Sequence, residues 1–163
     1  MVRTRPQRPA WSRITDEQLL DLRLCDLGLS LERSPMQPRI DRLYSELDRA
    51  GLRFRPHVWI GTEWASPDGV PGFSVPFYLI HPRLLRIEHR MMGEVEGGTT
   101  EWSLRILRHE TGHAFDSAYA LRRRRDWRQM FGMSSKSYPP TTSRDPSAAA
   151  RPPAPGCGAC VQS

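Results

Sequence analysis

One five-residue stretch of this chain has residue types and spacing that could do chemistry together: His109-Glu110-Thr111-Gly112-His113. Side chains four residues apart on a helix share one face and lie about 5–6 Å apart, so both imidazoles can reach one zinc ion. Zinc lowers the pKa of its bound water toward about 7, and Glu110 would stand where it can take that proton. The motif therefore predicts metal-assisted hydrolysis, most often of a peptide bond.

These side chains need a helix to position them, and the flanking residues predict one. Thr99 and Thr100 are both candidate N-caps, and no proline occurs from residue 101 to residue 124. On a helix, His109 and His113 would lie opposite an apolar stripe, so that one face enters the core and the other presents ligands. Gly112 either allows close packing near the metal or is a tolerated defect, since glycine costs about 1 kcal/mol relative to alanine in a helix. The stripe comprises Leu104, Leu107, Ala114, Phe115, Ala118 and Leu121.

The residues before this helix predict further helices and a small sheet, so the expected fold class is α+β. A capping box of Thr15 and Gln18 begins a first helix, for which Gly28 is a plausible end. A proline inside the second expected strand, Pro76, favours an edge position. An edge strand can hold an extended peptide by main-chain pairing. The other expected elements are helices at 38–50 and 82–92, strands at 54–60 and 73–80, and a turn at 66–69.

Composition limits the classes of protein that fit. The chain has 163 residues, a formal charge of +6 and a pI near 9.9, which suits one basic domain. We expect a basic flexible arm at 1–10, a folded domain at 11–138 and a disordered Pro/Ala-rich tail at 139–163. The sequence contains no run of about 18 apolar residues, so we expect no membrane span. The N-terminus lacks the apolar core of a signal peptide. Three cysteines without a paired framework favour the cytoplasm.

A series of segments occurs in an order that carries a family resemblance. Before the motif stand Leu22-Arg23-Leu24-Cys25-Asp26-Leu27, Pro38-Arg39-Ile40, Leu52-Arg53-Phe54-Arg55-Pro56-His57, Ser66-Pro67-Asp68-Gly69-Val70-Pro71-Gly72, Pro76-Phe77-Tyr78-Leu79 and Glu94-Val95-Glu96-Gly97-Gly98-Thr99. The series resembles the zinc-binding metallopeptidases of bacteria, a family of the zincin type, over about residues 11–138. The resemblance implies a zincin-like fold, Zn²⁺ held by His109 and His113, Glu110 as general base, and a peptide or protein substrate.

The chain departs from that family after the motif helix. Family members continue into further helices, with an acidic segment that supplies the third metal ligand, whereas here the likeness stops near Tyr138. A truncation or a change of reading frame would explain the shift. A catalytic zinc site uses three protein ligands and water. Asp116, seven residues after His109, is one candidate third ligand; it could also orient an imidazole N–H, or be a plain salt-bridged residue.

Three functions are compatible with these observations. The first is zinc-dependent hydrolysis of peptide bonds, impaired because only two ligands are assigned, with weak zinc binding and little turnover as the expectation. The second is an inactive, truncated remnant of such an enzyme. The third is a basic module that binds nucleic acid or an acidic partner through Arg122–Arg125, although arginine also suits the last turn of a helix, and we do not expect nucleic acid as a partner.

The remaining histidines and cysteines are assigned no chemistry. His57, His81 and His89 are scattered along the chain and are expected to be surface or packing residues. Cys25 lies in a leucine-rich segment and is expected to be a small core residue. The pair Cys157 and Cys160 would need two further ligands to bind zinc.

Overall fold

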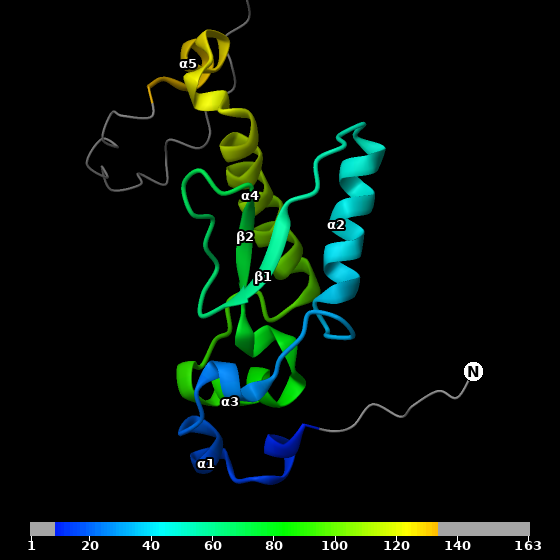
Figure 1. Ribbon diagram of the computed structural model, residues 1–163, viewed down its shortest axis with the longest axis vertical. Coiled ribbons are helices and arrows are strands. Elements are labelled where there is room, and N and C mark those ends of the chain that lie inside the picture. The colour runs from blue at the N-terminus through cyan, green and yellow to red at the C-terminus, as the bar shows by residue number, and fades with distance from the viewer. Residues whose placement is uncertain (1–8, 134–163) are drawn as a thin grey trace, which may run out of the picture.

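The computed structural model describes residues 9–133, which form an α+β fold organised along one long helix (Figure 1). The predicted tail at 139–163 and most of the predicted arm at 1–10 lie outside the described residues. Within the described range, no helix is long and apolar enough to cross a membrane. The predicted α+β class is therefore confirmed for the part of the chain that the structure describes.

The long helix is α4 (Thr100–Tyr119), and it contains the whole motif. It begins as predicted, because the Thr99 side chain accepts a hydrogen bond from the Trp102 backbone N–H at 3.2 Å. It ends earlier than residue 124, since Ala120 adopts a left-handed conformation with φ of 50°. The Arg122 backbone N–H donates to Asp116 Oδ1 at 2.8 Å and so folds the chain back onto the last turn.

Two short parallel strands, β1 (His57–Gly61) and β2 (Gly72–Pro76), lie along α4. Both are shorter than predicted. Pro56 precedes β1 and Pro76 ends β2, and neither can donate a backbone hydrogen bond to extend the ladder. After Pro76 the chain turns into the 3-10 helix η3 (Phe77–Ile80) instead of continuing as a strand.

The connection between the strands returns along the free side of β2. There Ala65 forms an isolated antiparallel bridge with Ser74, which is paired with Trp59 of β1 on its other side. The Ser74 backbone N–H donates to the Ala65 carbonyl at 2.9 Å. The segment 63–66 is therefore the outermost strip of the sheet on this side.

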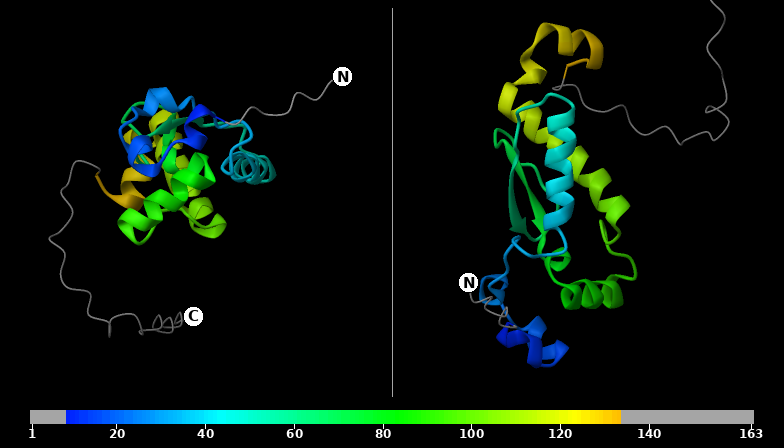
Figure 2. Two further views of the ribbon diagram at one scale, coloured as in Figure 1. Left: turned by 90° about the horizontal axis from the view of Figure 1, so that it is seen from below. Right: turned by 90° about the vertical axis from the view of Figure 1, so that its right-hand side faces the viewer.

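Helix α2 (Gln37–Arg49) packs against α4, and Figure 2 shows both helices running lengthwise beside the sheet. Two hydrogen bonds of 2.8 Å join the Arg108 guanidinium to the Glu46 carboxylate across this contact. The main apolar core lies between α2, α4 and the sheet. It comprises Met36, Ile40, Leu43, Phe54, Phe73, Val75, Leu79, Ile80, Val95, Leu104, Leu107 and Ala114.

The N-terminal elements form a second apolar cluster at one end of the molecule. The capping box is confirmed in α1 (Asp16–Leu20), but the helix predicted to reach Gly28 is interrupted. The chain leaves helical geometry after Leu20 and resumes as the 3-10 helix η2 (Leu24–Leu27), which Gly28 ends with φ of 55°. Cys25 on η2 is exposed, so its prediction as a core residue is wrong.

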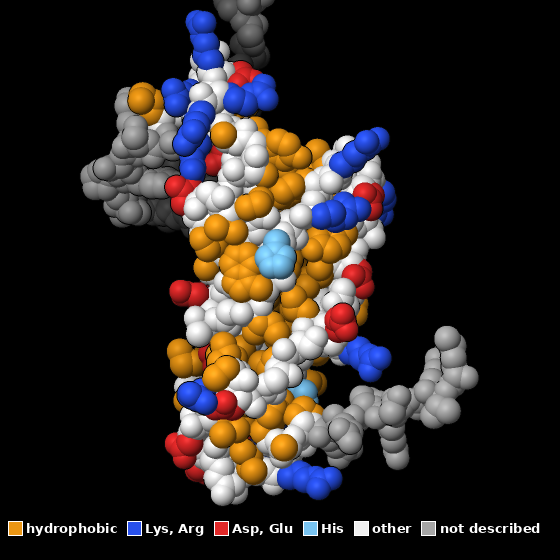
Figure 3. Space-filling model, in the orientation of Figure 1, with side chains coloured by type: hydrophobic (Ala, Val, Ile, Leu, Met, Phe, Trp, Pro, Cys, Tyr) orange, Lys and Arg blue, Asp and Glu red, His pale blue; other side chains and the backbone are white. Residues whose placement is uncertain are grey.

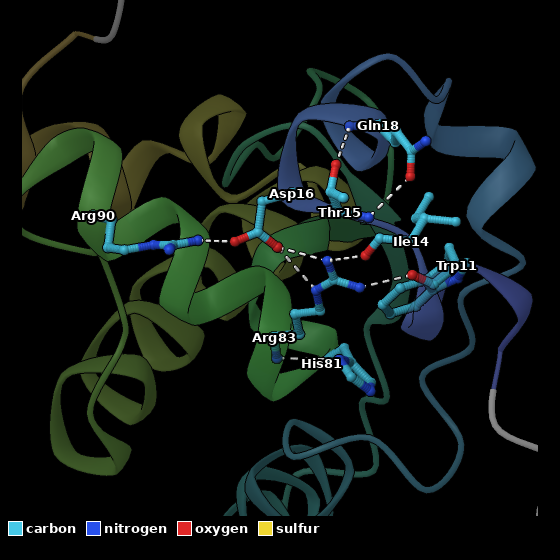
Figure 4. Close-up of polar contacts among 8 residues, drawn as sticks. All are labelled: Trp11, Ile14, Thr15, Asp16, Gln18, His81, Arg83 and Arg90. Atoms are coloured by element: carbon cyan, nitrogen blue, oxygen red, sulfur yellow. Dashed lines mark hydrogen bonds and ion pairs between the residues drawn. The ribbon is translucent and has the colours of Figure 1, made fainter.

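Arginine side chains of α3 (Pro82–Met92) fasten these elements to the rest of the fold (Figure 4). Arg83 donates to the carbonyl oxygens of Trp11 and Ile14, each at 2.7 Å, and pairs with Asp16 at 2.6 Å. Arg90 pairs with the other oxygen of Asp16. These two arginines, Arg90 first, hold the pKa of the Asp16 carboxyl below its usual value.

A short basic and apolar segment lies at the opposite end. It consists of the 3-10 helix η4 (Leu121–Arg123) and α5 (Arg125–Phe131), where arginine side chains gather in Figure 3. The arginine run is therefore not the last turn of α4, contrary to the sequence interpretation. Arg122 pairs with Asp68 and Asp116, and Arg124 pairs with Asp126.

Candidate metal centre

The two motif histidines lie side by side on the exposed face of α4. The Nε2 atoms of His109 and His113 are 3.0 Å apart, and their ring centroids are 4.7 Å apart with the planes nearly perpendicular. Both residues are exposed, while Leu104, Leu107 and Ala114 of the same helix are buried on the other side. The predicted division of the helix into a core face and a histidine face is confirmed at these three residues, but Ala118 of the predicted stripe is exposed and Leu121 lies beyond the end of the helix.

The spacing of the two nitrogens fits a shared zinc ion. Two nitrogens that each lie 2.0–2.1 Å from one zinc at a tetrahedral angle are about 3.3 Å apart. The observed 3.0 Å differs from this by a small rotation of either ring. The same distance also suits a direct hydrogen bond between the rings, whose direction depends on their tautomers.

Glu110 lies next to the histidines in the chain but has a different environment. It is only 9% exposed, on the side of α4 that faces the 63–66 segment. The hydroxyl of Ser66 lies 2.9 Å from Glu110 Oε2 and 3.2 Å from the Glu110 carbonyl oxygen. The carboxylate is therefore held by a residue of the 63–66 segment, 44 residues earlier in the sequence.

An open hollow of about 520 Å³ lies beside the motif. His109 and Glu110 are among the residues that line it, whereas His113 is not. One indole wall, Trp64, packs edge-on against Gly97, where an added Cβ would come within 3.0 Å of Trp64 Cζ2. The other lining residues are Glu96, Trp102, Arg105 and Ile106.

Asp116 has other partners than the histidines. One carboxylate oxygen accepts the Arg122 backbone N–H, and the other lies 3.5 Å from the Arg122 guanidinium. Within residues 9–133, no group of three His, Cys, Asp or Glu side chains is arranged to hold a metal ion. His109 and His113 are therefore brought together as predicted, whereas a role of Asp116 as third ligand or as partner of an imidazole stays a prediction.

The other sequence candidates lie on elements other than the motif helix. His57 is exposed and stacks on Trp59 at 5.6 Å, and His89 is exposed on α3. The His81 imidazole caps the N-terminus of α3 by accepting the Arg83 backbone N–H at 3.1 Å. These positions agree with surface and packing roles. Cys157 and Cys160 lie outside the described residues.

Two contributors to the site carried no usable signal in the sequence. Ser66 was recognised as a turn residue, but its contact with Glu110 spans a distance along the chain that periodicity cannot detect. Gly97 precedes the predicted helix, but only the structure shows that its missing side chain leaves room for Trp64. Both depend on the tertiary fold.

Compared with known proteins, the chain matches no family model, no curated protein and no solved structure. The resemblance of its segments to bacterial zinc metallopeptidases therefore stays a prediction from the sequence. The function has to be inferred from the motif and from the geometry of the residues around it.

Proposed function

We propose that this chain is a zincin-like zinc hydrolase that acts on peptide bonds, with His109 and His113 as metal ligands and Glu110 as general base. The observation that carries the proposal is the pair of histidine Nε2 atoms 3.0 Å apart on the exposed face of one helix, together with a hollow lined by both His109 and Glu110. A catalytic site accounts for both the exposed histidine pair and the nearly buried carboxylate beside it.

The two histidines would hold the ion, and the remaining coordination positions are left for water, for substrate and for a ligand from outside the described residues. Zinc supplies two effects when bound: it lowers the pKa of water toward about 7 and polarises a carbonyl group. Glu110 accepts the proton of the attacking water and returns it to the leaving nitrogen of the peptide. Its low exposure limits the number of bulk waters that compete for the carboxylate oxygens.

The surroundings of the motif suit an extended peptide. The 63–66 segment is the outer strip of the sheet and lies against Glu110, so its main chain can pair with a substrate strand. The hollow beside it offers Trp64 and Trp102 as walls, which fit a large apolar or aromatic substrate side chain. Arg105 and Glu96 also line the hollow, and these charged groups would limit the charge that a substrate side chain can carry there.

Zinc binding tests the proposal first. Calorimetric titration of the metal-free chain with zinc should show one site per chain, bound more weakly than at a three-ligand site. Either His109→Ala or His113→Ala should abolish that site. Glu110→Gln should keep zinc and lose hydrolysis of a quenched fluorescent peptide library, whatever the absolute rate of the parent chain.

A matched control is available in His89→Ala, because His89 is exposed and lies on α3 and not on the motif helix. This variant should bind zinc as the parent chain does. If His89→Ala and His109→Ala lowered zinc binding equally, the metal would be held by scattered surface histidines and the proposal would be wrong.

A basic binding module is the weaker candidate. Two of the four arginines in 122–125 are engaged by carboxylates of the chain itself, Arg122 with Asp68 and Asp116, and Arg124 with Asp126. These pairs give the run a structural role in shaping the end of α4. A salt-sensitive shift with nucleic acid that disappears in Arg123→Ala would favour the module instead.

A further inference from the structure

We propose that Ser66 is a positioning residue that holds the Glu110 carboxylate toward the hollow, a role that rests on the hydrolase function proposed above. The contact is direct, with Ser66 Oγ 2.9 Å from Glu110 Oε2. The Glu110 carbonyl oxygen is a second acceptor at 3.2 Å. A hydroxyl has one proton, and the ionised carboxylate is both the closer and the stronger acceptor, so Ser66 donates to it.

The carboxylate needs such a partner because it is nearly buried. Glu110 is 9% exposed, and within residues 9–133 its side-chain oxygens have no hydrogen-bond partner besides Ser66. A glutamate side chain has three rotatable bonds, and a desolvated carboxylate without a donor would turn toward solvent. Ser66 therefore selects the orientation in which Glu110 lines the same hollow as His109.

Ser66 is itself fixed by the strand that packs on α4. In the 63–66 segment, the Ala65 carbonyl accepts the Ser74 backbone N–H at 2.9 Å, and the Glu63 carbonyl accepts the Ser74 hydroxyl at 2.7 Å. Ser74 belongs to β2, which contacts α4 directly. The serine and the glutamate are thus carried by elements that pack on each other, and their separation is set by the core rather than by a free loop.

A double-mutant cycle in the metal-free chain tests the contact. Urea unfolding is measured for Ser66→Ala, Glu110→Ala and the double variant. The two single changes should be non-additive, with a coupling of about tenfold in the unfolding equilibrium constant, as expected for a hydrogen bond to a charged group.

Hydrolysis by the zinc-saturated chain tests the positioning role. The probe is 4-nitrophenyl acetate, an activated ester that reports weak hydrolytic activity. Ser66→Ala should lower kcat by about 10- to 100-fold, with KM and the zinc Kd changed less than about twofold, since the base is misplaced but the metal ligands are intact. Ser66→Thr keeps the hydroxyl and should restore kcat to within about threefold of the parent chain.

The matched control is Ser103→Ala, which removes a buried serine hydroxyl from α4 that accepts a hydrogen bond from Arg39 at 3.0 Å. It should lower stability and leave kcat unchanged. Additive stabilities in the cycle, or an unchanged kcat in Ser66→Ala, would overturn the positioning role while leaving the hydrolase function intact. A parent chain whose ester hydrolysis is the same as that of Glu110→Gln would instead show that the hydrolase function fails, and the positioning role with it.

Discussion

The residue before the second motif histidine, Gly112, lies on the exposed face of α4, and a Cβ added there would meet no atom within 4 Å. The structure therefore favours the interpretation of Gly112 as a tolerated defect over close packing. Gly112→Ala should raise the free energy of unfolding by about 1 kcal/mol through helix propensity alone. Urea unfolding measures the gain, and calorimetry should find zinc affinity unchanged. A loss of zinc affinity in this variant would mean that the metal or its ligands need the open space.

Gly97 presents the opposite case, because its φ is 75° and an added Cβ would lie 3.0 Å from Trp64 Cζ2. Gly97→Ala should lower the free energy of unfolding by about 2 kcal/mol or more, of which the left-handed backbone accounts for about 1–2 kcal/mol. The contact with Trp64 adds the remainder and displaces one wall of the hollow.

Gly69→Ala separates these two effects. Gly69 has nearly the same φ, 77°, but an added Cβ there meets nothing within 4 Å. The free energy of unfolding of the Gly69→Ala variant should fall by the backbone cost alone. The near-ultraviolet circular dichroism spectrum of this variant should match that of the parent chain. Equal losses in the two variants would show that Trp64 moves aside without cost.

At the scale of elements, the ion pair between α2 and α4 ties the motif helix to its neighbour. Two arginines, Arg108 first and then Arg42, hold the pKa of Glu46 at about 2, well below its usual value. A depressed carboxylate pKa stabilises the folded state above the unfolded value of about 4.3, and the effect is lost as the pH falls toward 2. The pair is partly exposed to solvent, so its contribution is about 1 kcal/mol.

Glu46→Gln checks this effect. The unfolding free energy of the variant should lie below that of the parent chain at pH 7, and the difference should shrink as the pH falls from about 5 to about 2. Glu32→Gln, a change at an exposed residue without an ion pair in the described part of the chain, should show no such trend. A difference that persists at the acid end of this range would mean that Glu46 contributes by packing and not by charge.

The elements that the sequence predicted well are those whose signals are local. The Thr99 cap, the capping box of Thr15 and Gln18, and helix α3 at Pro82–Met92 all depend on residues within one or two turns. The errors share a different origin. The end of α4 depends on Arg122 folding back onto Asp116, and the outer strip of the sheet depends on Ala65 meeting Ser74, contacts that hydrophobic periodicity does not encode.

The candidate site likewise has one part that local sequence predicts and one part that only the tertiary fold determines. Helix geometry alone brings His109 and His113 together, so their spacing could be predicted from the motif itself. The environment of Glu110 could not, because burial and the Ser66 hydroxyl come from the sheet. A motif thus specifies which groups are present, while the orientation of the base is a property of the tertiary fold.

The described part of the molecule has two apolar clusters, one around α4 and the sheet and one around the N-terminal elements, and Arg83 secures the second. Its guanidinium side chain is 16% exposed and satisfies the carbonyl oxygens of Trp11 and Ile14 as well as Asp16. Arg83→Ala should lower the free energy of unfolding by about 2–3 kcal/mol, because it leaves these acceptors without their donor.

The clusters share only two partly buried residues, Leu29 and Tyr78, so we expect the damage from Arg83→Ala to be mainly local. Amide hydrogen exchange should accelerate across 11–27, while the amides of α4 keep most of their protection and calorimetric zinc binding is unchanged. His81→Gln is a milder change at the same end, since it alters the cap of α3 and the edge-on contact of His81 with Trp11 but keeps the contacts of Arg83 with residues 11–16. If exchange in α4 rose as much as exchange in 11–27, the two clusters would unfold as one unit, and the N-terminal elements would be part of what stabilises the metal centre.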